Sequence, residues 1–353
     1  RKSDFWTSCC VGRNCSGQDN IVINLRGEIL LKKHIINILK QAQGTCVSGQ
    51  DLCEQLGVSR TAVWKHINQL REEGYTIDSS ARKGYRLIDV PDLLNEYEVE
   101  PLLTTEVLGH PIIHFREVPS TNIEARKYAR EGAAEGTVIV AEHQTAGRGR
   151  SGRSWFSSQE WAIQMSLILR PKVSPALAAS ITQIGAAAVA KALESLGLSP
   201  QIKWPNDVLL SEKKVCGILT EMSCELDHIN HIVIGIGINV NTPHFPDDVA
   251  SVATSVRIEK GEAWSRKKLM AAVLNAFEPL YKEFLEGKEH PEYLRICRTL
   301  SNLIGQHITY ETTKGRLSAK AIDIDNFGRL IVQHSDGSTE TLLSGEVHIG
   351  TQE

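Results

Sequence analysis

Apolar residues near the start of the chain recur at helical spacing. One apolar face is formed by Leu31, Ile35, Ile38 and Ala42, which predicts a first helix. The segment SGQDLCEQLGVSRTAVWKHINQLREEG predicts a short helix, a turn at Gly57 and a second helix capped by Ser59. The next segment, YTIDSSARKGYRLID, alternates apolar and polar residues about a turn and predicts a β-hairpin. Together these elements predict a winged helix-turn-helix domain over residues 29–90.

The last predicted helix of this domain carries a polar, basic face opposite its apolar face. Phosphate positioning and base readout need cations and hydrogen-bond donors at this place, so the pattern favours DNA binding. Such modules also serve as protein contacts, and the sequence alone leaves that alternative open. The candidate DNA-binding residues are Arg60, Thr61, Trp64, Lys65 and Asn68 on the helix, and Arg82 and Lys83 at the hairpin tip.

A larger α/β unit is predicted over residues 112–300, after an interdomain connection over 91–111 that mixes proline, acidic residues and short apolar runs. Strands are predicted for the runs PIIHFREV, TVIVAE, AIQMSLILRP, QIKW, KVCGILTEMS and HIVIGIGINVN. A turn is predicted at residues 205–207, between the fourth and fifth of these runs. Several neighbouring strands have no helix between them, which indicates a mixed, largely antiparallel sheet.

The two ends of the chain differ from this central unit. Residues 301–353 consist of short apolar runs separated by DNFG and SDG, which predicts a small β-barrel. Residues 1–28 lack the apolar core of a secretory signal and are interpreted as a leader or extension outside the fold. The predicted fold class is therefore α+β, with a winged helix, a mixed-sheet α/β domain and a C-terminal β-barrel.

Composition narrows the class of protein without indicating a function. The net charge is -3 and the pI is about 6.5, so any nucleic-acid binding must come from a local patch. The long apolar run over 175–197 is interrupted by polar residues and indicates a buried helix rather than a membrane span. The eight cysteines include no C-x-x-C pair and no Cys/His cluster at zinc spacing, so we expect reduced thiols, a cytoplasmic location and no metal site.

The segment TAGRGRSGRSW places three glycines directly after a predicted strand. Gly147, Gly149 and Gly152 spell G-x-G-x-x-G, the pattern of a dinucleotide-binding turn. Such a turn must open a helix, because the pyrophosphate sits on the helix N-terminus, whereas here a strand is predicted next. A Walker A loop is excluded as well, because no G-K-[ST] follows the glycines.

The arginines of this segment, Arg148, Arg150 and Arg153, predict anion binding instead. Guanidinium groups bind carboxylates and phosphates through paired hydrogen bonds, while glycines let the backbone approach a ligand closely. Taken alone, the loop also fits a solvated basic loop or an RNA contact. The motif KWPND adds Lys203 near the end of a strand, where a turn follows and where its charge suits phosphate oxygens.

Together these motifs resemble the biotin protein ligase family, specifically the two-function kind that carries a winged helix and represses biotin genes. The matching motifs, in family order over residues 30–350, are SGQDLCEQLGVSRTAVWKHI, STN, QTAGRGRSGR, KWPND, GILTE and IGIGINVN. The resemblance implies a central ligase domain and a C-terminal SH3-like barrel. It also implies an enzyme that activates biotin with ATP to give biotinyl-5'-AMP and then transfers biotin to a lysine of the biotin carboxyl carrier protein.

The resemblance assigns a role to each matching motif. The implied biotin- and adenylate-binding residues are Ser120, Thr121, Asn122, Gln144, Gly147, Arg148, Gly149, Arg150 and Lys203. The first four would meet the polar ureido end of biotin or its surroundings, although residues 120–122 also fit a plain helix cap. The loop would fold over the adenylate as a lid. Arg150 and Lys203 are the candidate catalytic residues, because preorganised cations stabilise charge on phosphoryl oxygens.

Some positions stay open at this point. Trp155 either covers the ligand or packs under the loop, and Gly235 and Gly237 either allow close approach of a strand or mark a bulge. The family commonly has a Gly-flanked turn followed by an aromatic residue where this chain reads SQEWAIQ over 158–164. We therefore expect the shape or affinity of the biotin pocket to differ along this edge.

The resemblance also implies cofactors, partners and location. Mg²⁺ is expected with ATP, without a dedicated carboxylate cage. The implied partners are the biotin carboxyl carrier protein and biotin operator DNA, with a homodimer promoted by the adenylate, in the cytoplasm and away from membranes. Two alternatives remain: a biotin-sensing transcription factor without ligase activity, and a lipoate-type ligase. The intact Arg148, Arg150 and Lys203 argue against the first, and the arginine loop and winged helix argue against the second.

Overall fold

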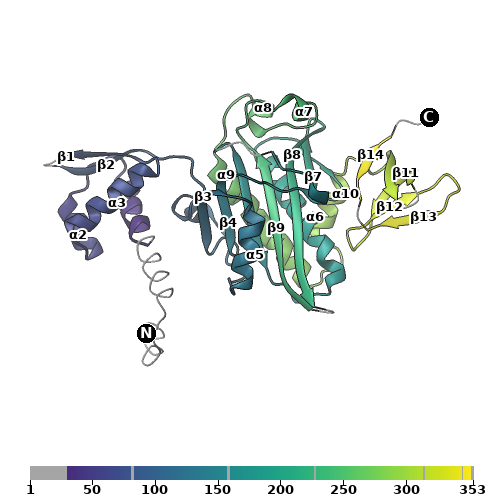
Figure 1. Ribbon diagram of the computed structural model, residues 1–353, viewed down its shortest axis with the longest axis horizontal. Coiled ribbons are helices and arrows are strands. Elements are labelled where there is room, and N and C mark those ends of the chain that lie inside the picture. The colour runs from purple at the N-terminus through teal and green to yellow at the C-terminus, as the bar shows by residue number, and fades with distance from the viewer. Residues whose placement is uncertain are drawn as a thin grey trace. The chain divides into compact units, whose positions relative to one another are not determined.

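A computed structural model describes residues 30–80, 83–156, 160–225, 228–312, 315–343 and 345–350 (Figure 1). The chain divides into two units that meet between Pro91 and Asp92, and each unit is described by itself. The leader predicted over 1–28 and the hairpin-tip residue Arg82 lie outside the described residues.

The first unit has the winged-helix order that the sequence predicts. It consists of a helix over 30–41, α2 (Gly49–Leu56), α3 (Arg60–Glu72) and the antiparallel strands β1 (Thr76–Ser80) and β2 (Gly84–Asp89). The Ser59 side chain accepts a hydrogen bond from the backbone N–H of Ala62, so the predicted cap of α3 is present. Ile35, Leu52 and Ile67 are completely buried, which places one apolar core beneath all three helices.

The hairpin of this unit is tied to the turn before α2. Val47 and Tyr85 exchange two backbone hydrogen bonds of 2.8 Å. A side chain at Gly84 would come within 2.0 Å of the Val47 carbonyl oxygen, and its φ of 94° lies in the left-handed region. Only glycine fits both conditions, so this residue sets how closely the hairpin packs on the helices.

The second unit is built on a seven-stranded mixed sheet. Its strands are β3 (Ile112–Val118), β4 (Val138–Gln144), β5 (Ala162–Leu169), β6 (Gln201–Lys203), β7 (Asp207–Leu210), β8 (Lys213–Glu225) and β9 (His228–Asn239). The strand order is β3-β4-β5-β9-β8-β7-β6, and among these described strands only β3 and β4 pair in parallel. The largely antiparallel sheet is confirmed. The four-residue strand β7, which begins at the last residue of the predicted turn, was not predicted.

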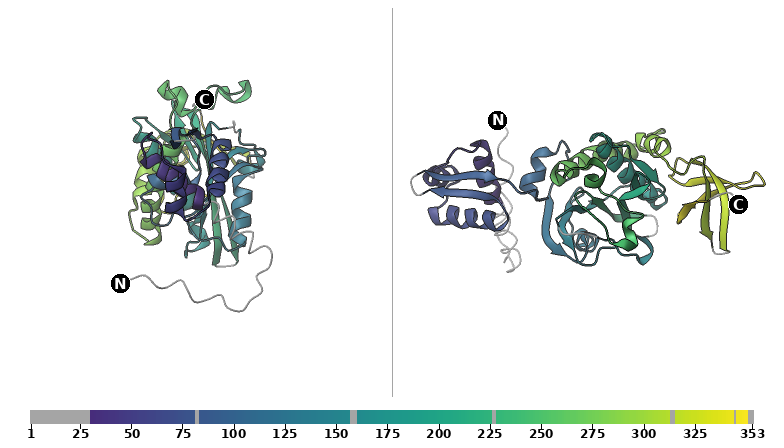
Figure 2. Two further views of the ribbon diagram at one scale, coloured as in Figure 1. Left: turned by 90° about the vertical axis from the view of Figure 1, so that its left-hand side faces the viewer. Right: turned by 90° about the horizontal axis from the view of Figure 1, so that it is seen from above.

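Helices cover both faces of this sheet (Figure 2). On one face α5 (Thr121–Arg130) buries Ala125 and Ala129 against strands β4, β5 and β9. On the other face α6 (Ala178–Glu194) and α9 (Arg266–Leu285) pack on each other and on the main core. Shorter helices of the unit include α7 (Asp247–Ala250), α8 (Val256–Lys260) and α10 (Glu292–Thr299).

The helix α6 is both long and apolar. With the turn before it, Pro175–Glu194 is long and apolar enough to cross a membrane by length and composition. The fold nevertheless buries 67% of its most apolar window against other parts of the protein. This burial is typical of a core helix, as the polar interruptions in its sequence predict.

The segment predicted as an interdomain connection, residues 91–111, is largely part of the second unit. Residues from Asp92 onward belong to the second unit, and they include α4 (Glu96–Val99) and a 3₁₀ turn (Glu100–Leu102). Leu94, Val99 and Leu108 are completely buried in the main core. The segment looked like a linker because its apolar residues are spaced too irregularly to show a helical period.

The chain ends in an antiparallel β domain. Its strands are β10 (His307–Thr312), β11 (Gly315–Ile324), β12 (Leu330–Gln333), β13 (Thr339–Leu342) and β14 (Val347–Ile349), in the order β13-β12-β11-β10-β14. The Gly328 carbonyl, in the β11–β12 turn, accepts hydrogen bonds from the side chains of Gln183 and Trp204. The predicted three-part α+β architecture is thus present.

Candidate functional site

A cavity of the second unit has a volume of about 350 Å³ and opens where the arginine loop crosses the sheet. Among the residues predicted from sequence, its walls include Ser120, Thr121, Asn122, Gln144, Arg148, Gly149, Arg150 and Lys203. Gly147 does not line the cavity; it lies against Trp155, where a side chain would come within 2.8 Å of the Trp155 carbonyl oxygen. Folding therefore brings distant motifs of the sequence to one site.

One end of the cavity is a polar cluster at the start of α5. The Gln144 Oε1 atom accepts hydrogen bonds from the Thr121 backbone N–H at 2.7 Å and its hydroxyl at 3.1 Å. Ser166 donates from its hydroxyl to Thr121 Oγ1 and Asn122 Oδ1 at 2.8 and 2.6 Å. Ser120 precedes the helix without making a side-chain capping bond, so the plain cap interpretation does not hold for this residue.

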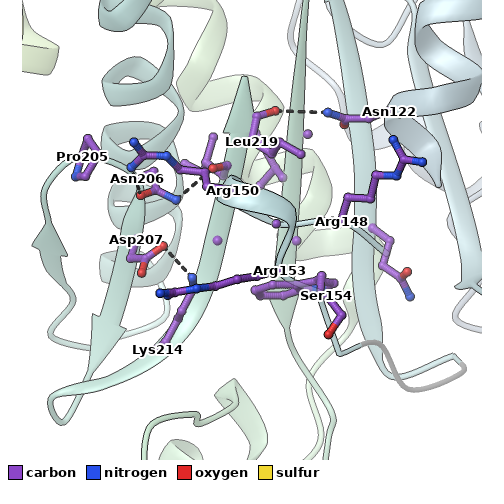
Figure 3. A pocket seen from close by; sticks show the side chains of 18 of the residues that line it. Asn122, Arg148, Arg150, Arg153, Ser154, Pro205, Asn206, Asp207, Lys214 and Leu219 are labelled. Carbon is purple, nitrogen blue, oxygen red and sulfur yellow. Dashed lines mark hydrogen bonds and ion pairs between the residues drawn. The ribbon is translucent and has the colours of Figure 1, made fainter. Parts of the chain in front are cut away.

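Asn122 is held from a second side by β8. Its Nδ2 donates to Glu221 Oε2 at 2.8 Å. The same atom donates to the Leu219 carbonyl at 3.3 Å, as Figure 3 shows. A side chain at Gly235 would come within 2.1 Å of Asn122 Oδ1. The absent side chain of Gly235 thus lets α5 approach β9, so this glycine serves close packing.

Trp155 forms the floor at another part of the cavity. Its ring lies directly against Gly217 of β8 and Gly237 of β9, where an added Cβ would meet ring atoms at 2.7 Å. The pairing of β5 with β9 is continuous at Gly237, so this glycine marks close approach rather than a bulge. Lys214 Nζ lies 5.6 Å from the centroid of the Trp155 ring, within the range of a cation–π contact.

Cationic side chains surround the opposite end of the cavity. Arg150 Nη1 donates to Asn206 Oδ1 at 3.0 Å, and Asn206 Nδ2 donates to the Ile218 carbonyl at 3.0 Å (Figure 3). Lys203 lines the cavity from the end of β6, and its side chain makes no hydrogen bond or ion pair within the described part of the chain. A lysine without a bonded carboxylate, beside a held arginine, favours an anionic ligand.

The KWPND turn both builds a hairpin and contributes to the cavity wall. Asn206 and Asp207 build the β6–β7 hairpin, in which Lys203 pairs with Asp207 through the backbone. Both turn residues also line the cavity, and Asp207 Oδ1 lies 2.7 Å from Lys214 Nζ. This ion pair fixes Lys214, a cavity cation that no motif of the sequence indicates.

The C-terminal β domain also contributes to the cavity wall. Gly345, Glu346 and Val347 line it, and Glu346 forms an ion pair with Arg153 of the arginine loop. The hydrogen bond from Arg153 lowers the pKa of the Glu346 carboxyl below its ordinary value, and the charge of Lys203 adds a smaller effect in the same direction. No local pattern predicts this contact, because the two paired residues are separated by most of the second unit.

A buried ion cluster is centred on Glu142, near the end of β4 and just before the arginine loop. Glu142 accepts hydrogen bonds from His114 Nε2 at 2.8 Å and from Arg266 Nη1 at 2.7 Å. Burial by itself raises the pKa of Glu142, but the His114 hydrogen bond and the Arg266 charge outweigh it and hold the pKa at about 2. Glu142 also accepts from the Leu94 backbone N–H, so the cluster joins the start of the second unit to β4.

The candidate DNA-binding face lies on α3 in the first unit. Arg60, Thr61, Trp64 and Lys65 are exposed, Asn68 is half-buried, and Lys83 is exposed in the hairpin turn. Asn68 Oδ1 accepts a hydrogen bond from Arg71, and Arg60 donates to Gln50 of α2. The exposed residues of α3, which include Trp64, thus lie on one side of the helix.

No group of three or more metal-ligating side chains occurs among the residues that the structure describes. The acidic residues of the cavity wall, Asp207 and Glu346, are each paired with a cation.

The fold and the site define a class of protein: a winged helix joined to an α/β domain whose cavity has a polar end and a cationic end. Models of three families match the chain in the same order: the HTH domain at residues 32–86, the biotin/lipoate A/B protein ligase family at 115–239, and the biotin protein ligase C terminal domain at 303–350.

Curated relatives match nearly the whole chain. It is 40% identical to the bifunctional ligase/repressor BirA of Bacillus spizizenii, over 91% of this chain and 99% of that protein. The protein of the same name from Escherichia coli is 30% identical, over 88% of this chain and 95% of that one. The chain therefore belongs to the bifunctional biotin ligase/repressor family, which confirms the resemblance read from its motifs.

A solved structure agrees with the fold of the second unit. The biotin protein ligase from Aquifex aeolicus in complex with biotin and ATP is 28% identical and superposes with a TM-score of 0.59. The match covers 68% of this chain and 99% of that one.

Proposed function

We propose that this protein is a biotin--[acetyl-CoA-carboxylase] ligase that also represses transcription by binding DNA. The cavity supports the proposed ligase activity. In it, the polar cluster of Thr121 and Asn122 faces the cations Arg150 and Lys203. Biotin has a polar ureido end and a carboxylate end, and ATP supplies phosphates. The two ends of the cavity thus match the chemistry of the two substrates.

The reaction has two steps. In the first, a carboxylate oxygen of biotin attacks the α-phosphorus of ATP, a new P–O bond forms, and pyrophosphate leaves. In the second, the amino group of a carrier lysine attacks the acyl carbon of biotinyl-5'-AMP. An amide bond forms, AMP leaves, and the lysine loses one proton.

Both reacting groups of the first step are anions, so the site must offset their repulsion. Lys203 is assigned to the carboxylate and the α-phosphate, because its charge lines the cavity without a bonded carboxylate in the described chain. Arg150 is assigned to the phosphoryl oxygens, with Asn206 fixing its orientation at 3.0 Å. Arg148 and Gly149 belong to the same loop and would close over the adenylate, which excludes water from a reactive anhydride.

Mg²⁺ is expected to enter with ATP. The carboxylates of the cavity wall are engaged with Lys214 and Arg153, so triphosphate oxygens and water molecules would supply most of the ligands. The ion would neutralise charge on the leaving pyrophosphate.

The repressor function is assigned to the first unit. An exposed α3 with Arg60, Lys65 and Trp64 fits a recognition helix in the major groove of operator DNA, and Lys83 fits a phosphate contact of the wing. The adenylate is expected to promote a homodimer, which would match two half-sites of an operator. Because ATP, the carrier protein and genomic DNA meet in the cytoplasm, we assign the protein to that compartment.

The test of the enzymatic proposal is transfer of biotin to a carrier domain. Purified protein is mixed with biotin, ATP, Mg²⁺ and the unmodified carrier domain, and labelling is read with streptavidin. Lys203→Met is expected to reduce labelling about tenfold or more, because the carboxylate and the α-phosphate lose their shared cation. An unlabelled carrier with the wild-type protein would refute ligase activity, and lipoyl transfer in place of biotin would support the lipoate alternative.

A further inference from the structure

One polar side chain in the cavity wall is buried without a partner. Gln164 of β5 is 1% exposed, and neither its Nε2 nor its Oε1 atom has a hydrogen-bond partner among the described residues. Trp155 Nε1, in the same cavity, is also buried without one. Burying an unpaired amide costs free energy, so a leucine of similar size would be more stable at this place.

The sheet register places Gln164 between the polar end of the cavity and Trp155. It lies two residues before Ser166 on β5, so both side chains point to the same face of the sheet. Ser166 is the residue that hydrogen-bonds Thr121 and Asn122. Across the sheet Gln164 pairs with Gly237, against which the Trp155 ring lies.

The residues on either side of Gln164 have an ordinary structural role. Ile163 and Met165 point to the opposite face and belong to the main core. Farther along the same face, Ile168 packs against Ala125 and Ala129 of α5. Gln164 thus interrupts a largely apolar strand at the point where the strand reaches the cavity.

We propose that Gln164 is a specificity-determining residue, whose amide hydrogen-bonds an edge of the bound substrate that offers a donor beside an acceptor. A primary amide presents an N–H donor and a carbonyl acceptor side by side, and Trp155 Nε1 adds a second donor. The ureido ring of biotin has such an edge, and so does the adenine of ATP, which glutamine reads through paired hydrogen bonds. This inference rests on the proposed ligase function, and the experiment separates the two sources.

The test compares Gln164→Leu with the full-length wild-type protein. Titration calorimetry measures the Kd of biotin and of a non-hydrolysable ATP analogue, each alone, and steady-state assays measure KM for each substrate and kcat. We expect a rise of about tenfold or more in Kd and KM for one substrate, because two hydrogen bonds to it are lost. The values for the other substrate and kcat are expected to change less than about threefold.

Analogues identify the group that is bound. If biotin is affected, the wild type is expected to discriminate against 2-iminobiotin, which replaces the ureido carbonyl, and the variant is expected to lose that discrimination. If the Kd of the ATP analogue is the one affected, the probe is purine riboside triphosphate, which lacks the exocyclic amine. The wild type is then expected to discriminate against it, and the variant is expected to lose that discrimination. The ligand-free variant is expected to melt at a higher temperature, because it no longer buries an unpaired amide.

The matched control is Ile168→Val, on the same strand but outside the cavity wall. It loosens β5 slightly and is expected to leave the Kd of both ligands unchanged. Should the introduced leucine pack badly and lower the melting temperature, Gln164→Met provides a second apolar side chain of similar length. The proposal would be overturned if the apolar variant left the Kd values of both ligands unchanged. It would also be overturned if the apolar variant and the control weakened the binding of both ligands equally. Failure of the wild type to label the carrier would instead refute the ligase function.

Discussion

The close approach of Gly235 to Asn122 leads to a prediction about biotin binding. In Gly235→Ala the new Cβ would lie 2.1 Å from Asn122 Oδ1, about 1.3 Å short of an ordinary contact. Asn122 must therefore move, and it then loses its hydrogen bonds with Ser166 and Glu221. Two lost bonds of about 1 kcal/mol each and an overpacking cost of about 1–3 kcal/mol make unfolding easier by about 3–5 kcal/mol. We expect biotin to bind about ten- to a hundredfold more weakly.

Urea unfolding and titration calorimetry with biotin measure both effects. Gly49→Ala in the first unit is the matched control, because its Cβ would meet the Tyr85 ring at an ordinary 3.5 Å. A double-mutant cycle isolates the clash: in an Asn122→Ala background, Gly235→Ala is expected to cost little further stability. If Gly235→Ala bound biotin as tightly as the wild type, the role assigned to Asn122 would be wrong.

Other parts of the structure lead to three more predictions. Glu142→Gln is expected to lower stability by about 3 kcal/mol at pH 7, since the folded pKa of about 2 lies below the ordinary value of 4.5. Because this contribution is present above the unfolded pKa and is lost as pH falls, urea unfolding of the two proteins should converge between about pH 4.5 and 2. Arg150→Ala is expected to release or hydrolyse the adenylate several-fold faster and to relax acceptor selectivity, as measured by adenylate retention on a desalting column; unchanged retention contradicts the lid. Lys65→Ala is expected to weaken operator binding about tenfold with carrier labelling intact, as read by gel shift and streptavidin blot; loss of labelling alone would contradict the division of labour between the units.

Much of the architecture was predictable because its signals are local. The winged helix is contained in one continuous segment, whose apolar spacing, Ser59 cap and Gly57 turn each act within a few residues. The arginine loop and Lys203 were found for the same reason, since a run of arginines and a KWPND turn need no tertiary context to be recognised. The burial of residues 92–111 has no local signal, because it depends on Arg266 and the core residues of α9, far along the chain.

The sequence by itself determined the order of the three domains and the main cations that the cavity uses. Only the tertiary structure decided which other residues join them. Gln164, Lys214 and Glu346 reach the cavity through the pairing of β5 with β9, the β7–β8 hairpin and the packing of the C-terminal domain. Strand pairing and domain packing bring together residues that are distant in sequence, and no local spacing encodes them. Even the glycines at 217, 235 and 237 became interpretable only when Trp155 and Asn122 were found lying against them.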